Sequence, residues 1–369
     1  MNATILPPPL PDSPFSNSYA EARNKFLAAA QGRGAVLDSH VHPLTGFHGE
    51  SLAMDVACLG DASSPKALLL SSACHGIEGY CGSGVQLALL NDAERCRRYA
   101  ASGVAIFLVH AINPHGFSFG RRVTEDNVDL NRNTQDFSAP LPENPGYEEL
   151  AALLVPDTWP PSAANEAAIA DFIERRGLAA YQAAVSGGQY RHPEGLFFGG
   201  HAPTWSQRRM RQFLRVHREV WRHLGWIDFH TGLGPNGHGE RICANRDDAS
   251  ALARTRAWWG EGVTSIYDGS SSSAPLTGLL WLTVQQECPD TQYTGMALEY
   301  GTEPVPAVID ALRASSWLGV HPDAPPALQA SIRAQVRRAF YTETEAWREA
   351  IVRQGLAAID EAICALQVA

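Results

Sequence analysis

Four groups of polar residues in this chain follow short apolar stretches, and their residue types are suited to metal and carboxyl chemistry. The first group is His75 and Glu78, which follow the apolar run 67–73 and stand among glycines. A turn can aim an imidazole and a carboxylate three positions apart at one point, and zinc accepts both as ligands. The motif is short and often arises by chance, so it needs support from residues farther along the chain.

The second group lies in the segment 113–133, which follows the apolar run 104–110 and carries Arg122, Asn131 and Arg132. Such a loop can present planar, permanently charged guanidinium groups to a carboxylate or to a developing oxyanion. The plainer interpretation is a solvated loop held by its own ion pairs.

The third and fourth groups depend on single residues at the ends of apolar stretches. His230 follows the stretch 226–229, with Asp228 two positions earlier on the same face of a strand, so this carboxylate can orient the imidazole. Glu299 stands in the apolar stretch 296–300. An unpaired carboxylate is costly to bury there, which indicates a charged partner or a chemical task.

An α/β fold with a central sheet would bring the four groups together. Apolar runs of strand length occur at 52–59, 67–73, 104–110, 226–229, 262–267 and 296–300. Helical stretches occur at 19–31, 84–99, 165–181, 205–224, 249–259 and 304–317. We predict a mixed, mostly parallel sheet with helices on both faces, and a hairpin between the first two strands. The four groups are then expected at the carboxyl edge of the sheet.

We expect residues 1–369 to form a single domain with two additions. Residues 1–18 are rich in proline and serine and are expected to form an irregular arm. Prolines break the segment 140–205, which is expected to be an insertion that narrows or caps the cleft. The chain ends in one or two long helices, with a core-facing stripe of Ile332, Val336, Phe340, Trp347 and Ile351.

Composition argues against several classes of partner. The 29 basic and 39 acidic residues give a net charge of −10 without a basic cluster, so no nucleic acid partner is expected. The seven scattered cysteines do not form a disulfide framework and indicate a reducing compartment. Since there is also no signal peptide and no apolar run of membrane-spanning length, a cytoplasmic location without membrane contact is expected. The oligomeric state is left open.

Taken in this order, the motifs resemble those of the zinc carboxypeptidase superfamily. This superfamily comprises the metallocarboxypeptidases and their aspartoacylase and succinylglutamate desuccinylase relatives. The resemblance covers about residues 67–301 and is nearest to an uncharacterised bacterial group of carboxypeptidase-like proteins. Its motifs here are H-x-x-E at 75–78, N-P-H-G at 113–116 and D-L-N-R at 129–132. It implies a phosphorylase/hydrolase-like fold and one zinc ion held by His75, Glu78 and His230.

The same resemblance assigns the remaining roles. Glu299 matches the general base, and Arg122 would polarise the scissile carbonyl. Asn131 and Arg132 would bind the terminal carboxylate of a peptide or acyl-amino-acid substrate. The implied activity is hydrolysis of an amide or peptide bond next to a free carboxylate. The mobile tyrosine of the superfamily has only a weak candidate here, Tyr267, and no motif locates the residue that sets side-chain preference.

Three alternatives remain at this point. An N-acyl amino acid deacylase of the aspartoacylase type would use the same reacting groups and differ in what fills the pocket. A non-catalytic protein with this fold would bind carboxylate ligands without turnover. The pair His40 and His42 is typical of amidohydrolase barrels, although such barrels need about eight strand–helix units and the spacing here is uneven.

Overall fold

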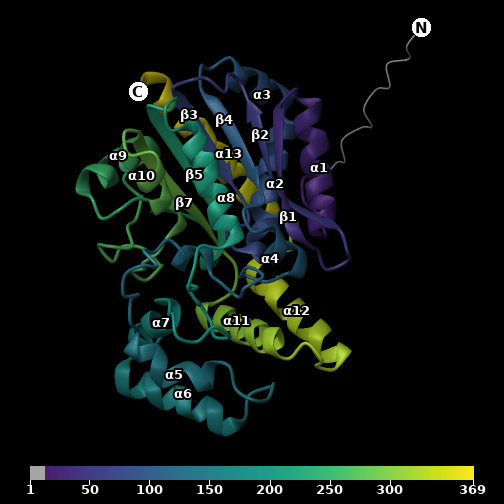
Figure 1. The fold of residues 1–369 in the computed structure, drawn as a ribbon, viewed down its shortest axis with the longest axis vertical. Helices are drawn as coiled ribbons and strands as arrows, with labels where there is room; N and C mark the ends of the chain where they lie inside the picture. The colour runs from purple at the N-terminus through teal and green to yellow at the C-terminus, as the bar shows by residue number, and fades with distance from the viewer. Residues whose placement is uncertain (1–12) are drawn as a thin grey trace.

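The computed structural model describes residues 13–369, so the first twelve residues of the expected N-terminal arm lie outside the described part. A seven-stranded sheet forms the centre, in the order β1-β2-β4-β3-β5-β7-β6 (Figure 1). The strands are β1 (Val36–Thr45), β2 (Ser51–Leu59), β3 (Lys66–Ser71), β4 (Ala105–His110), β5 (His223–Asn236), β6 (Gly239–Cys243) and β7 (Gln292–Gly301). The four central strands are parallel and the outer pairs antiparallel, which confirms the predicted mixed sheet.

Helices cover both faces of this sheet (Figure 1), as expected. The α-helices are α1 (Tyr19–Gly32), α2 (Gly79–Asn91), α3 (Ala93–Ala100), α4 (Pro114–Phe119), α5 (Pro145–Leu154), α6 (Ala163–Arg176), α7 (Leu178–Ser186), α8 (Trp205–His217), α9 (Ala249–Trp259), α10 (Thr283–Glu287), α11 (Val305–Val320), α12 (Pro326–Phe340) and α13 (Glu345–Val368). Alternate residues of β3 enter two separate apolar cores. Leu68 and Leu70 join the first core with α1, α2 and α13, whereas Leu69 joins the second core with α8 and α10.

Several predicted strands differ from those in the structure. β2 and β3 do not form the predicted hairpin, because β4 lies between them and pairs with both. Each side of the buried strand β3 therefore has a parallel neighbour. The predicted strand 262–267 is wrong, since only a single bridge from Thr264 to Ile242 forms there. The exposed strand β1 and the short strand β6 were not predicted, because neither has an apolar pattern.

The predicted helices are found at shifted boundaries. The stretch 84–99 is divided at Asp92, whose side chain accepts a hydrogen bond from the amide of Arg95 and so begins α3. The stretch 165–181 is divided at Gly177, which adopts a φ of 87°. The predicted helix 205–224 ends at His217, and the predicted helix 249–259 is confirmed as α9. The C-terminal stripe is buried and is shared between α12 and α13.

Five helices gather beyond the carboxyl ends of the central strands (Figure 1). They are α5, α6 and α7 from the segment 140–205, with α11 and α12 from the connection between β7 and α13. The buried Arg313 of α11 joins the two sets by donating to the Leu153 carbonyl and to Glu166, at 3.0 Å each. Within residues 13–369, no helix has the length and apolarity needed to cross a membrane. The space between the central strands and these helices contains the site.

Candidate active site

The turn that carries His75 and Glu78 is held against the loop that carries Arg122. β3 ends at Ser71, and a short 3-10 helix over 76–78 then leads into α2. The amide of Gly76 donates to the carbonyl of Arg122 at 3.1 Å. A Cβ atom on Gly76 would lie 2.0 Å from the carbonyl carbon of Gly116, so only glycine permits this close approach. Gly76, which lies within the H-x-x-E motif, therefore sets how closely the turn with His75 and Glu78 approaches the loop with Arg122.

His75, Glu78 and His230 meet at one point, although more than 150 residues separate the last two. Nδ1 of His75 lies 2.9 Å from one oxygen of Glu78, and Nδ1 of His230 lies 2.9 Å from the other. The candidate ligand atoms of the three residues all lie within 4.8 Å of one another, and all three residues are buried. Two imidazoles and a carboxylate in this arrangement are suited to a first-row metal ion.

Each imidazole is also oriented by a second carboxylate. Nε2 of His230 lies 2.7 Å from Asp228, the residue predicted to orient it. Nε2 of His75 lies 3.2 Å from Asp129, a role that sequence reasoning missed. The only available signal was the place of Asp129 at the start of the D-L-N-R motif. The pair of Asp228 and His230 fixes the orientation of that ring. Nε2 of His75 also lies 2.8 Å from Nη2 of Arg122, so Asp129 and Arg122 together orient the ring of His75.

A second triplet of candidate ligands, Cys74, Asp228 and His230, also lies within 4.8 Å. Burial and the neighbouring carboxylates raise the pKa of Cys74 well above its ordinary value. The thiol is therefore the stable form, whereas metals bind the thiolate. In addition, both carboxylate oxygens of Asp228 are already hydrogen-bonded, to Nε2 of His230 and to Ser71, so the first triplet is the better candidate.

The charges of the first triplet are strongly coupled. Burial favours the neutral carboxyl, but the charges and hydrogen bonds of His75 and His230 hold the pKa of Glu78 well below its ordinary value. Burial opposes a charge on His230 as well, yet Asp228 and Glu78 raise the pKa of this imidazole well above its ordinary value. In the absence of a metal, these shifts favour the charged imidazole of His230 between the carboxylates of Asp228 and Glu78. A metal ion that binds here must displace this proton.

Glu299 lies on β7 directly across from His230 of β5 in the sheet register. Its side-chain oxygen accepts a hydrogen bond of 3.1 Å from the amide of Leu233. Burial and the charge of Glu78 raise the pKa of Glu299 to about 8. A carboxyl group with a pKa near neutrality is suited to accept a proton and to return it.

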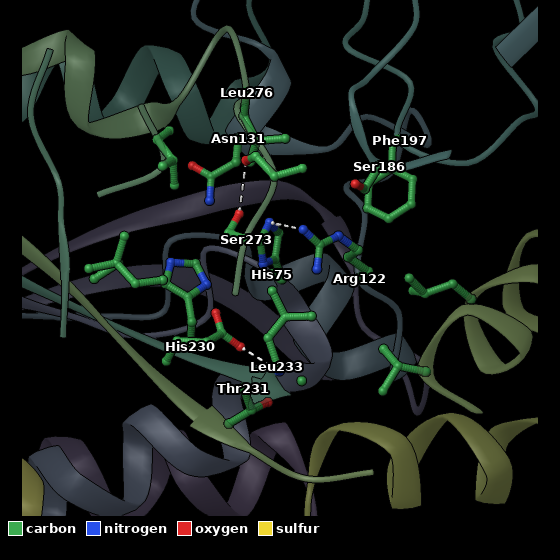
Figure 2. A pocket seen from close by; sticks show the side chains of 18 of the residues that line it. His75, Arg122, Asn131, Ser186, Phe197, His230, Thr231, Leu233, Ser273 and Leu276 are labelled. Carbon is green, nitrogen blue, oxygen red and sulfur yellow. Dashed lines mark hydrogen bonds between the residues drawn. The ribbon is translucent and has the colours of Figure 1, made fainter. Parts of the chain in front are cut away.

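Arg122 lies between the predicted metal ligands and their orienting carboxylate. Its guanidinium donates to Glu78 at 3.1 Å and to Asp129 at 2.9 Å, and Nη2 lies 2.8 Å from Nε2 of His75 (Figure 2). Burial opposes its charge, but Asp129 and Glu78 raise the pKa of Arg122 above its ordinary value. A permanently charged donor therefore stands beside the candidate metal site.

Asn131 and Arg132 face the same pocket from the D-L-N-R motif. The side-chain oxygen of Asn131 accepts a hydrogen bond from the Leu280 amide at 3.0 Å, while its amide nitrogen points into the pocket (Figure 2). Arg132 is buried and donates to the backbone carbonyls of Asn131 and Ser186. Its Nε has no hydrogen-bond partner among the described residues. Burial lowers the pKa of Arg132 relative to its ordinary value.

One cavity of about 110 Å³ connects these groups. It is lined by six of the seven predicted site residues, namely His75, Arg122, Asn131, Arg132, His230 and Glu299. Glu78 is buried and is not among the residues that line the cavity. Tyr267 is not among the lining residues and packs against the second core instead, whereas Ser273 and Ala274 of the loop 269–274 do line the cavity.

The pair His40 and His42 lies on β1, at the edge of the sheet. His42 contacts Glu125 at 3.2 Å and does not line the cavity. The sheet is open and begins with an antiparallel pair, so the barrel alternative is wrong.

Comparison with solved structures yields remote similarities. Carboxypeptidase A from Helicoverpa armigera is 13% identical over 89% of this chain and 75% of that chain, with a TM-score of 0.40. Bovine thrombin-activatable fibrinolysis inhibitor is 12% identical over 93% of this chain and 98% of that chain, with a TM-score of 0.41. A succinylglutamate desuccinylase from Silicibacter is 14% identical over 78% of this chain and 65% of that chain, with a TM-score of 0.37.

No curated protein matches the chain significantly. Residues 15–354 match the family described as "Protein of unknown function (DUF2817)". The chain belongs to this family.

Proposed function

We propose that the chain, as a member of the DUF2817 family, is a zinc-dependent hydrolase that cleaves an amide or peptide bond next to a free carboxylate. The observation that carries the proposal is the orientation of two imidazoles. His75 and His230 each turn Nδ1 toward Glu78 and Nε2 toward a separate carboxylate. Two imidazoles from distant parts of the chain therefore converge on one buried carboxylate, as the ligands of a single metal ion must.

His75, Glu78 and His230 would hold the zinc ion. Two imidazoles and one carboxylate are a ligand set of catalytic zinc sites, which keep a further position for water or substrate. When bound, zinc supplies a water molecule of lowered pKa and an electrophile for the carbonyl oxygen. The remaining chemistry comes from the side chains around it.

Glu299 accepts the proton of the attacking water and then passes it to the departing amine nitrogen. Arg122 stabilises the negative charge that develops on the carbonyl oxygen. To do so, its guanidinium must exchange part of its contact with Glu78 for the substrate. Asn131 and Arg132 bind the free carboxylate, through the amide nitrogen of Asn131 and the guanidinium donors of Arg132 that the backbone leaves free.

Metal analysis tests this proposal directly. We expect close to one zinc ion per chain in the wild type and little zinc in His75→Ala, because this variant loses one of three ligands. The matched control is His40→Ala, which removes a histidine outside the cavity and is expected to retain the wild-type zinc content. Equal zinc in all three proteins would rule out the site.

Turnover separates the enzyme from a binding protein of the same fold. We expect the zinc-loaded wild type to hydrolyse members of a panel of acyl amino acids and short peptides, and Glu299→Gln to lose this activity. Retention of zinc and ligands without any hydrolysis would favour the binding protein. We propose a cytoplasmic location as well, which is supported by seven cysteines that are all free.

A further inference from the structure

The cavity beside the reacting groups has two apolar walls, and each wall belongs to a different core of the protein. The strand-side wall belongs to the second core or packs against it, and consists of Ile242, Leu276, Leu279 and Trp281. The helix-side wall lies on α11 at the first core and consists of Val305, Val308, Ile309 and Leu312. A substrate that reaches the site therefore has apolar surface on two sides.

The position of Asn131 shows which wall lies beside the bound carboxylate. Its side-chain oxygen is hydrogen-bonded to the amide of Leu280, the residue between Leu279 and Trp281 of the strand-side wall. If Asn131 and Arg132 bind the carboxylate, the side chain of the same amino acid lies against the strand-side wall. The helix-side wall is then left for the acyl group on the other side of the scissile bond.

Neither wall offers a partner for a charged substituent. Among the described residues that line the cavity, the only charged or titratable side chains are His75, Arg122, Arg132, His230 and Glu299. Each of these has a role in the proposed metal binding, proton transfer, charge stabilisation or carboxylate binding. A charged substituent buried against either wall would remain unpaired, which is costly.

The cavity is also small. Its volume is about 110 Å³. Beside the cavity, Gln182 of α7 donates to the carbonyl of Ser272 at 3.4 Å and so joins α7 to the loop 269–274. The backbone carbonyl of Ser186, also on α7, accepts a hydrogen bond from Arg132. Ser186 and Ser273, a residue of the loop 269–274, are both labelled in Figure 2. A cavity of this size favours a small ligand over a polypeptide.

We propose, on the basis of the proposed hydrolase activity, that the substrate is a small N-acyl amino acid with apolar groups on both sides of the amide. The strand-side wall selects the amino acid side chain, and the helix-side wall on α11 selects the acyl group. Polypeptides and N-acyl derivatives of acidic amino acids are poor substrates.

Ligand binding to zinc-loaded Glu299→Gln tests this substrate class without turnover. Isothermal titration compares N-butyryl-L-leucine with N-acetyl-L-aspartate and trileucine. We expect N-butyryl-L-leucine to bind at least about tenfold more tightly than either of the others, since burial of a few methylenes suffices for this factor. Equal or tighter binding of the aspartate derivative or of the peptide would overturn the proposal.

Two matched variants test the assignment of the walls. Val305→Ala and Leu276→Ala each shorten one partly exposed aliphatic side chain, so that neither variant opens a cavity in a core. Val305→Ala is expected to reduce the preference for a butyryl over an acetyl group by about fourfold per lost methylene contact, and to leave the preference for leucine over alanine unchanged. Leu276→Ala is expected to do the reverse. If both variants change the same preference, or neither variant changes any, the assignment is wrong.

Turnover by the wild type separates this inference from the proposed function. If N-butyryl-L-leucine binds as expected but is not hydrolysed, the ligand class is supported and the hydrolase assignment fails. If peptides of three or more residues are hydrolysed as fast as N-butyryl-L-leucine, the hydrolase assignment is supported and the substrate class is wrong.

Discussion

Replacement of Glu299 by glutamine tests whether this carboxyl group is protonated beside Glu78 when no metal is bound. Burial and the charge of Glu78 raise the pKa of Glu299 from an ordinary value of 4.5 to about 8. Between these two pH values the folded chain holds a proton that the unfolded chain releases, so this group makes the folded wild type less stable as the pH rises. Glutamine does not ionise, and its oxygen can still accept the hydrogen bond from the Leu233 amide.

The unfolding free energy of the variant minus that of the wild type is therefore expected to increase with pH. One pH unit within this window is worth about 1.4 kcal/mol, so the difference grows by on the order of 3 kcal/mol from about pH 5 to about pH 7.5. This is an upper limit, because Glu299 keeps some exposed surface in the cavity, where water screens its charge.

Urea unfolding of both proteins in EDTA at these two pH values measures the difference. The matched control is Glu303→Gln, which replaces an exposed glutamate just beyond the end of β7. A difference between Glu299→Gln and the wild type that stays constant with pH would refute the reasoning. Saturating zinc is expected to reduce the dependence on pH, because a nearby cation lowers the pKa of a carboxyl group.

Three further predictions concern the groups around the metal site. Asp228→Asn should weaken zinc binding by about 10- to 100-fold in chelator competition, because it removes the carboxylate that orients His230. The control Asp247→Asn replaces an exposed aspartate and should leave zinc affinity unchanged. Equal zinc affinities of the two variants would exclude this positioning role for Asp228. Arg122→Ala should lower kcat by roughly 10²-fold or more, through lost stabilisation of the oxyanion, and an unchanged kcat would contradict this role. Arg132→Ala should raise KM far more for substrates with a free carboxylate than for their amides, and equal effects on both would remove Arg132 from carboxylate binding.

The buried centre of the fold could be predicted from the sequence, whereas its edges could not. The runs 67–73 and 104–110 are apolar because both faces of β3 and β4 are covered, so composition alone marks these strands. β1 is exposed along most of its length and therefore has no apolar pattern to recognise. The neighbours of β3 were also predicted incorrectly, because a turn between two strands does not determine whether they pair.

For the site, sequence reasoning could name residues at strand ends but not those whose role depends on tertiary packing. Asp228 could be assigned to His230 because the two lie on one strand at a spacing of two. Asp129 could not be assigned to His75, since the two residues are 54 positions apart and meet only when the loop folds back. The helix-side wall was missed for the same reason, because the position of α11 beside the cavity depends on its contacts with β5 and on the hydrogen bonds of Arg313 to α5 and α6, which are distant in the sequence.

The most direct test of the central claim is anomalous diffraction at the zinc edge from crystals of the zinc-loaded protein. We expect one strong peak at about 2.0–2.2 Å from Nδ1 of both His75 and His230 and from a carboxylate oxygen of Glu78. A peak elsewhere in the protein, or none between the two imidazoles, would contradict the proposed metal site and the hydrolase that depends on it.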